Sequence, residues 1–296
     1  MSNEKIQSII ARCLTEPDFL DRIRAGPGAT LRDYALDQGT RSKLLEFDFT
    51  PLEKFAGFIA KVQHNYLWEA FPGTLKLLQI TGLQIPIFSS YNRIHQQLRA
   101  NGLAGRNEKT RSFLRFLKEE LEQRQEPGVA VLREVLAHEE LLWRIESQLG
   151  EVETTVGDAQ GGGGELEASW TDGWGAIVLS IRGILVVREF AFDPAAVLSA
   201  LERDSFDPTD AQPTVQHLGY WGDTAARKVR VLALDSETTV LLAEIDGLRP
   251  LRTVIERTNA ALGGGIDPED FSPFFEGALR EGLLQIGPAH ASNEIG

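Results

Sequence analysis

A run of four glycines at 161–164 constrains the fold most, because the residue pattern differs on its two sides. Before it, apolar residues recur at three- and four-residue spacing, as in 132–145, which is typical of amphipathic helices. After it, runs rich in β-branched residues, such as 176–187, indicate strands. Glycine leaves the backbone maximal freedom, and 296 residues suffice for two domains. We therefore expect a flexible linker at 151-164.

These patterns predict an α+β protein with an all-helical N-terminal domain at 1-150, a glycine-rich linker, and a C-terminal α/β domain at 165-296. Helices are expected in the first domain at 51–65, 90–101, 108–123 and 128–149. Thr50 is expected to cap the helix that Pro51 opens, with Glu53 completing a capping box.

The C-terminal domain is expected to begin with a hairpin of strands 176–181 and 184–187 joined by Arg182-Gly183. The later elements are expected to be a helix at 194–203, strands at 215–221 and 227–234, and helices at 235–245, 250–262 and 268–284, the last capped by Asp267. Two strands followed by three helices, at about 214-286, is the order of a winged-helix-like unit.

The charge balance bears on nucleic acid as a partner. The chain has 30 basic and 43 acidic residues, a net charge of −13 that disfavours contact with phosphate backbones. The last predicted helix, 268–284, carries four acidic residues and one basic residue, whereas a helix that reads DNA is usually basic. The order of elements leaves a winged-helix DNA-binding transcriptional regulator as the alternative function. Because the charges disfavour it, no nucleic acid is expected as a partner.

Targeting and metal-binding signals are absent from the sequence. No apolar run approaches the about 20 residues of a membrane span, and the start MSNEKIQSII lacks the features of a signal peptide, so a cytoplasmic protein without a membrane partner is expected. Cys13 stands alone and at apolar helical spacing, which indicates a packed thiol. His138-Glu139 opens a zinc-peptidase motif, but Leu142 stands where the second histidine is needed. We expect no metal and no cofactor in this chain.

Catalytic motifs are equally sparse. No nucleophile elbow, phosphate-binding loop or dinucleotide fingerprint is found. Tyr91, His95 and Arg99 share a helix face at four-residue spacing and could serve a stand-alone enzyme, although such a stripe is more typical of a solvated face or a subunit contact. We expect no catalytic residue and no enzyme activity in this chain.

The strand 227–234 is the candidate binding element. Basic and apolar residues alternate along it, so one face is expected to be basic, and an extended peptide could add its backbone to the strand's edge. The residues predicted to bind a peptide are Lys228, Val229, Arg230, Val231, Ala233, Phe271, Phe274, Phe275 and Ala278. The alternative is that the strand face is plain solvent-facing surface and that the phenylalanines form the core, as expected for at least one of Phe274 and Phe275.

Three stretches resemble known families. From Tyr66 to Trp143 the order EAFPGTLKLL, Phe88-x-x-Tyr91, SFLRFLKE and VLREVLAHEELLW resembles the helical domain of the partner proteins that accompany multinuclear non-haem iron oxidases in ribosomal peptide maturation, of the methanobactin and thiaglutamate type. The residues that carry this resemblance are Phe71, Pro72, Phe113, Phe116, Leu117, Glu139 and Trp143. VRVLALDSETTVLLAEIDGLRPLRTVIE, at 229–256, is similar to the PqqD-type peptide-recognition fold, and 17–45 resembles a short helical module of peptide-maturation and ring-cleavage accessory proteins.

The resemblance implies a non-catalytic subunit of a heterodimer. Iron would sit in the partner oxidase, while this chain would bind the leader of a precursor peptide and present its cysteine-containing end. The residues that would face the oxidase are Phe71, Tyr91, His95, Glu139 and Trp143. Residues 165–213 match no part of these families.

Overall fold

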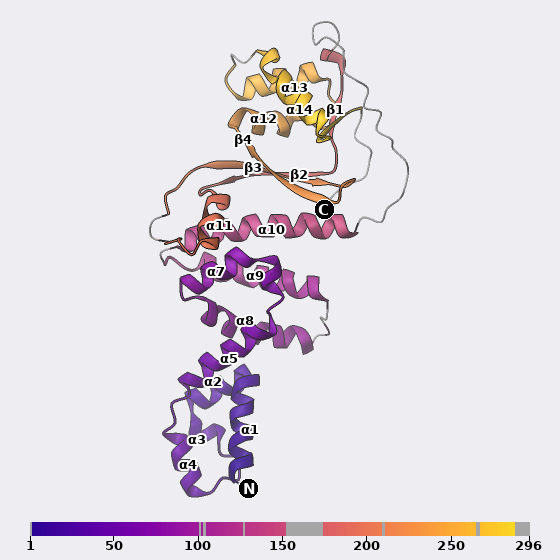
Figure 1. Ribbon diagram of the computed structural model, residues 1–296. Coiled ribbons are helices and arrows are strands. Elements are labelled where there is room, and N and C mark those ends of the chain that lie inside the picture. The colour runs from indigo at the N-terminus through magenta and orange to yellow at the C-terminus, as the bar shows by residue number, and fades with distance from the viewer. Residues whose placement is uncertain are drawn as a thin grey trace. The chain divides into compact units, whose positions relative to one another are not determined.

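The computed structural model describes residues 2–100, 102, 105–126, 128–151, 174–208, 211–264 and 267–287. It is an α+β protein with small antiparallel sheets, which confirms the predicted class (Figure 1). The chain divides into two compact units, Met1–Glu139 with Ala195–Ala211 and Glu140–Pro194 with Gln212–Gly296. The division falls inside one long helix, and the predicted linker lies, apart from Glu151, outside the described residues.

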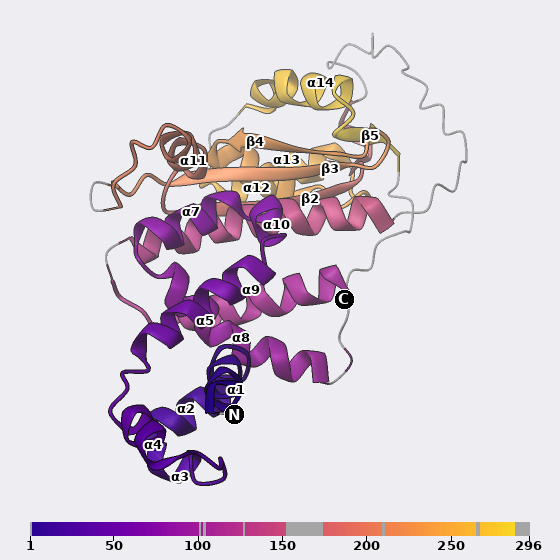
Figure 2. The same cartoon turned by 60° about the horizontal axis from the view of Figure 1, so that its bottom comes forward.

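The first unit is built of helices, which Figure 2 shows from a second side. They are α1 (Ser2–Thr15), α2 (Pro17–Ala25), α3 (Pro27–Thr30), α4 (Gln38–Leu45), α5 (Thr50–Gln63), α6 (Leu67–Ala70), α7 (Pro72–Ile80), α8 (Gln84–Ala100), α9 (Arg106–Glu122), the beginning of α10 (Val129–Glu151) and most of α11 (Pro194–Glu202). The all-helical pattern predicted before the glycine run is thus found in every described element there.

Helices α1 to α4 enclose a small core that includes Ile9, Cys13, Ile23 and Leu31. Cys13 is buried in it, which confirms the packed thiol, and burial raises the pKa of this thiol to about 11. Because the thiolate is the reactive form of cysteine, a thiol with so high a pKa is a poor nucleophile at neutral pH.

The start of α5 differs from the predicted capping box. The helix begins at Thr50 itself, and its first amide is capped by Asp48, whose Oδ1 accepts a hydrogen bond from the Thr50 N–H at 2.9 Å. Glu53 is engaged elsewhere, because its carboxylate accepts a hydrogen bond from Arg24 Nη1 at 2.8 Å. A charged carboxylate two residues upstream therefore does the work expected of the threonine hydroxyl.

Small residues let α5 approach α8 closely. Ala56, Gly57 and Ala60 are the buried residues of α5, and a Cβ added at Gly57 would lie 2.9 Å from Cγ2 and 3.0 Å from the carbonyl oxygen of Ile85. Only glycine fits this approach, so one face of α5 is fixed against its neighbour.

The second unit contains two antiparallel sheets, β2–β3–β4 and β1–β5. Its elements are the end of α10, a 3-10 turn at Trp174–Ala176, β1 (Leu179–Ile181), β2 (Ile184–Phe190), β3 (Gln216–Asp223), β4 (Lys228–Leu234), α12 (Ser236–Glu244), α13 (Leu251–Ala261), a 3-10 turn at Pro268–Phe271, α14 (Ser272–Arg280) and β5 (Leu284–Ile286). Strands β3 and β4 and helices α11, α12 and α13 lie within one to three residues of their predicted bounds.

The predicted hairpin of 176–187 is wrong. Strand β1 pairs with β5, and β2 pairs with β3 instead. Arg182 and Gly183 carry the chain from one sheet to the other, since the Arg182 N–H donates to Leu283 O at 2.8 Å and Arg182 O accepts from Trp221 Nε1 at 2.7 Å. Both groups of Arg182 are thus bonded to neighbours distant in sequence, and a tight β1–β2 turn does not form.

The predicted helix 268–284 is also corrected. Asp267 does cap its start, accepting from the Glu269 N–H at 3.0 Å, but the segment divides into the 3-10 turn and α14. Gly282 then adopts a positive φ of 79° and ends the helical segment, and Leu284–Ile286 form the short strand β5. Glycine permits this backbone conformation without a Cβ penalty.

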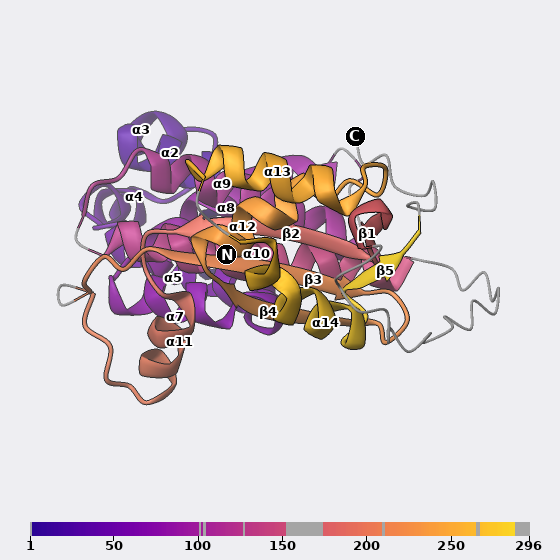
Figure 3. The ribbon, with the colours of Figure 1, turned by 90° about the horizontal axis from the view of Figure 1, so that it is seen from above.

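The three-stranded sheet has a different covering on each face. Leu185, Val187, Trp221, Leu232 and Leu234 pack with apolar residues of α12, α13 and α14, the helices that Figure 3 shows over the sheet. On the other face, a Cβ at Gly222 would lie 2.6 Å from Cγ2 of Ile145, on the end of α10. Both faces of the sheet are therefore in contact with helices of the same unit.

Candidate functional site

Strand β4 is an edge strand in the described part of the chain. It pairs along its whole length with β3, with Trp221 opposite Arg230 and Tyr220 opposite Val231, and no described strand pairs with its other side. An edge strand presents backbone N–H and C=O groups that another extended chain can pair with. The strand predicted as the binding element therefore has the topology that strand addition needs.

The side chains of β4 divide between its two faces. Lys228 and Arg230 share a face with Leu232 and Leu234, which pack against the core beneath α12–α14. Val229, Val231 and Ala233 lie on the opposite face, where Val231 and Ala233 are exposed. The basic face of the prediction is thus basic only in its first half and is continuous with the core in its second half.

Arg230 is held by two contacts. Its Nη1 lies 2.7 Å from Oε2 of Glu281, just beyond α14, and its guanidinium lies 5.1 Å from the ring centre of Trp221. The Arg230 and Glu281 side chains are 44% and 63% exposed, so water screens this ion pair and its contribution to stability is small. An incoming carboxylate could therefore replace Glu281 at Arg230 at low cost.

The aromatic residues predicted beside the strand lie mostly in the core. Phe271, Phe275 and Ala278 are buried, and Phe274 is partly buried against them. The expectation that at least one of Phe274 and Phe275 is core is confirmed. Phe271, Phe275 and Ala278 support the domain and do not line an open groove, because their side chains have almost no exposed surface.

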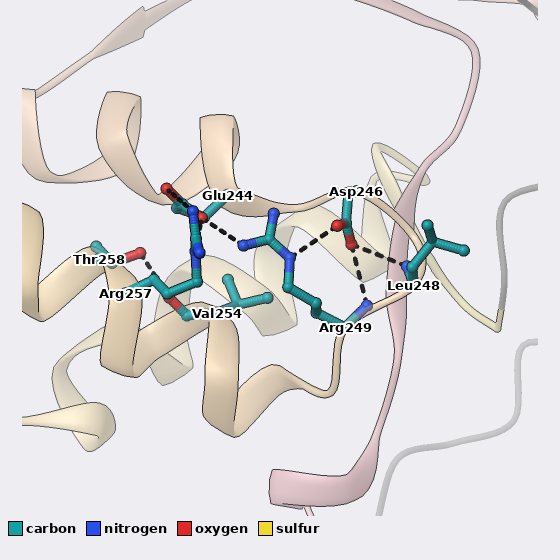
Figure 4. Close-up of polar contacts among 7 residues, drawn as sticks. All are labelled: Glu244, Asp246, Leu248, Arg249, Val254, Arg257 and Thr258. Atoms are coloured by element: carbon teal, nitrogen blue, oxygen red, sulfur yellow. Dashed lines mark hydrogen bonds and ion pairs between the residues drawn. The ribbon is translucent and has the colours of Figure 1, made fainter.

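The turn between α12 and α13, within the stretch 229–256, is fixed by charged groups (Figure 4). Oδ1 of Asp246 accepts from the N–H groups of Leu248 at 2.9 Å and Arg249 at 3.0 Å, while Arg249 Nη1 reaches Glu244 at 2.7 Å. Burial of the Asp246 carboxyl acts to raise its pKa, but these N–H groups and Arg249 outweigh that effect and lower the pKa to about 2. The Asp246 carboxylate is therefore charged at physiological pH, and its hydrogen bonds hold the backbone of the turn.

The residues predicted to face a partner lie largely inside the first unit. Phe71, Tyr91, His95 and Glu139 are buried, and Trp143, in the second unit, is partly buried. Tyr91 donates a hydrogen bond to Lys109 O at 3.1 Å, and the Arg99 side chain lies outside what the structure describes. Tyr91 and His95 are thus not part of the solvated face that the spacing favoured, and side chains buried in this way do not offer a docking surface.

A histidine pair lies beside Tyr91. The rings of His64 and His95 are edge to face at 4.4 Å between centroids, and His64 is also 5.0 Å from Tyr91 and stacked on Phe88. Burial, followed by the charges of His95 and Lys109, lowers the pKa of His64 to about 4. His64 is therefore neutral at pH 7, and its buried Nε2 has no hydrogen-bond partner in the described structure.

The sequence prediction missed two features of potential function. The first is the ion pair between Arg230 and Glu281, which no local sequence pattern indicates because the two residues are 51 positions apart. The exposed apolar residues of α5 were also missed, although Phe55, Phe58 and Val62 recur at three- and four-residue spacing opposite the small residues Ala56, Gly57 and Ala60. That periodicity was available from the sequence.

In the described ranges no three histidine, cysteine or carboxylate side chains are grouped as metal ligands, and no helix has the length and apolarity that crossing a membrane requires. Neither a protein-family model nor a curated protein sequence matches the chain.

Proposed function

We propose that this chain is a non-catalytic, cytoplasmic accessory subunit that binds the leader of a ribosomally made precursor peptide and presents the peptide's cysteine-containing end to an iron-dependent oxidase. The C-terminal unit would act as a winged-helix-like, PqqD-like recognition domain and the helical unit would dock the oxidase in a heterodimer. The single observation that carries the proposal is the edge position of β4, with its basic pair and its exposed valine.

Strand addition would use the two faces of β4 in different ways. Backbone hydrogen bonds along the edge would supply affinity, and alternate side chains would supply specificity. Acidic residues of the peptide would meet Lys228 and Arg230 on one face, while apolar residues would contact Val231 and Ala233 on the other. A peptide with alternating acidic and apolar residues is thus the chemistry that fits this edge.

No chemical step is assigned to this chain. Binding the leader on the subunit raises the local concentration of the peptide's other end at the oxidase, which accelerates the reaction without a catalytic residue here. The iron, and the oxidation of the cysteine-containing end, would belong to the partner enzyme.

The test is a selection of displayed 15-residue peptides on the full-length chain, followed by affinity measurements on the enriched sequences. Enriched peptides are expected to alternate apolar and acidic residues and to lose at least about tenfold in affinity with Val231→Pro, because proline lacks an amide and disrupts edge pairing. Val215→Pro, at an exposed valine just before β3, is the control and should bind as the unmodified chain does.

Two outcomes would contradict the proposal. If peptides bind equally well to Val231→Pro, provided that circular dichroism shows this variant to be folded, strand addition at β4 is wrong. If capture from the native cytosol recovers neither a precursor peptide nor an iron enzyme, the accessory role is wrong.

A further inference from the structure

The exposed apolar side chains of the described residues are concentrated in one segment. Ten large apolar side chains are exposed, and half of them lie between residues 45 and 62: Leu45, Phe47, Phe55, Phe58 and Val62. Single exposed apolar residues are ordinary, but an apolar cluster on one helix marks an interaction surface.

Three of these residues form a continuous ridge on α5, which we call the α5 ridge: Phe55, Phe58 and Val62. Their spacing of three and four residues places them on one side of the helix, and they are 50%, 48% and 57% exposed. The rings of Phe55 and Phe58 are stacked at 6.2 Å with an interplanar angle of 15°. The two aromatic rings of the ridge are therefore stacked on each other in the absence of a partner.

The opposite side of the same helix explains why the ridge cannot turn inward. Ala56, Gly57 and Ala60 are buried, and Gly57 lies against the Ile85 backbone of α8, so the rotation of α5 about its axis is fixed. Burying Phe58 by rotating the helix would remove this close approach. The exposed aromatic surface is thus a fixed property of the folded unit.

The charge beside the α5 ridge is positive. Lys54 and Lys61 stand one turn before Phe58 and one turn after it, along one border of the ridge. The acidic Glu53 points elsewhere and is engaged by Arg24. The Lys61 ammonium also lies 5.8 Å from the ring centre of Trp68. In a chain of net charge −13, two lysines along one border of the ridge favour an acidic partner.

We infer that the α5 ridge is a docking surface for a partner protein that presents an amphipathic helix with apolar residues bordered by aspartate or glutamate. The inference rests on the proposed function in that the oxidase would supply this helix. A second copy of the chain fits less well, because antiparallel pairing of two α5 helices about Phe58 brings Lys54 of one copy beside Lys61 of the other.

The experiment is a selection of displayed 18-residue amphipathic helices on the full-length chain. Enriched sequences are expected to be acidic and to lose about tenfold or more in affinity with Phe58→Ser, a change at an exposed position. The double variant Lys54→Glu/Lys61→Glu should lose roughly three- to tenfold, whereas Lys43→Glu/Arg115→Glu, with the same change in net charge at exposed residues elsewhere, should bind as the unmodified chain does.

Val231→Pro should leave this helix binding unchanged, so failure of strand addition and failure of the ridge can be told apart. The inference is overturned if no enriched helix depends on Phe58, or if the enriched helices are basic. It is also overturned if Phe58→Ser abolishes self-association of the chain, or if it abolishes binding to phosphatidylcholine vesicles containing phosphatidylglycerol. The last two results would assign the ridge to a second copy or to a membrane surface.

Discussion

The carboxylate of Glu139 on α10 accepts a hydrogen bond from the backbone N–H of Gly73 at 2.7 Å, across 66 residues of sequence. Its second oxygen accepts from the Thr74 N–H at 2.8 Å, so the two oxygens together cap the first turn of α7. Burial raises the pKa of Glu139 even though these N–H groups act to lower it. Glu139 is therefore an internal helix cap, which gives the HEELLW stretch a structural role.

Replacing Glu139 with glutamine should destabilise the first unit by about 1–3 kcal/mol. The glutamine side chain has one acceptor oxygen, whereas the backbone N–H groups of Gly73 and Thr74 each donate to a separate oxygen of Glu139. Urea denaturation followed by circular dichroism measures the change. Glu146→Gln, at an exposed position on the same helix, is the control and should stay within about 0.5 kcal/mol of the unmodified protein. Equal losses for the two variants would mean that the cap contributes nothing.

His64 should make the stability of the first unit depend on pH. The pKa of His64 is about 4 in the folded protein, whereas a histidine in an unfolded chain has its usual pKa of 6.5, so the unfolded chain binds the proton more readily. The stability that the neutral His64 contributes is fully present above pH 6.5 and is lost as the pH falls toward 4. The loss between pH 7.5 and pH 5 should be roughly 2 kcal/mol.

The measurement is the free energy of unfolding at several pH values for the unmodified chain and for His64→Phe. Phenylalanine keeps a ring beside Phe88 and cannot be protonated, so the variant should lose much less stability between pH 7.5 and pH 5. If both proteins lose the same amount, the histidine that titrates is a different one.

The crossing between the two sheets gives a third prediction. Gly183 has a φ of 84°, and a Cβ there would lie 2.2 Å from the Gly222 carbonyl oxygen. Gly183→Ala should therefore cost at least about 2 kcal/mol, since both the backbone and the neighbouring strand must move. Gly277→Ala, on α14 with open space around it, should instead stabilise the protein by about 0.5–1 kcal/mol. In thermal denaturation, the melting temperature should fall for Gly183→Ala and rise for Gly277→Ala.

What the sequence could and could not reveal follows from the range of the interactions. Amphipathic spacing and prolines within one segment identified α9, α10 and α11, and alternation identified β3 and β4. The β1–β5 pairing joins residues about a hundred positions apart, and the β5 segment is too short to carry a pattern of its own. The hairpin prediction failed because Arg182-Gly183 resembles a turn locally, while its partners, Leu283 and Trp221, are distant.

The candidate site was predicted in part for the same reason. The alternation of Lys228 to Val231 is local, and it identified the strand that lies at the sheet edge. Exposure of Phe271 or Phe275, in contrast, depends on how α14 packs, and a helix rich in phenylalanine has the same pattern whether it lines a groove or fills a core. Burial of Tyr91 likewise depends on Phe113 and Phe116 of α9, and the ring of His95 packs on His64 at the end of α5. The spacing of residues within α8 does not encode these neighbours.

The ion pair between Arg230 and Glu281 provides the last prediction, which concerns acidic peptides. Glu281→Gln removes the carboxylate that pairs with the Arg230 guanidinium. Displayed peptides that place an acidic residue beside Arg230 should therefore bind roughly three- to tenfold more tightly. The change in stability should stay below about 1 kcal/mol, because both side chains are well exposed. Isothermal titration at low and moderate salt measures the affinity. Glu237→Gln, at an exposed residue of α12, is the charge-matched control. If Glu281→Gln and Glu237→Gln change the affinity equally, only net charge is being sensed, and Arg230 does not select the peptide.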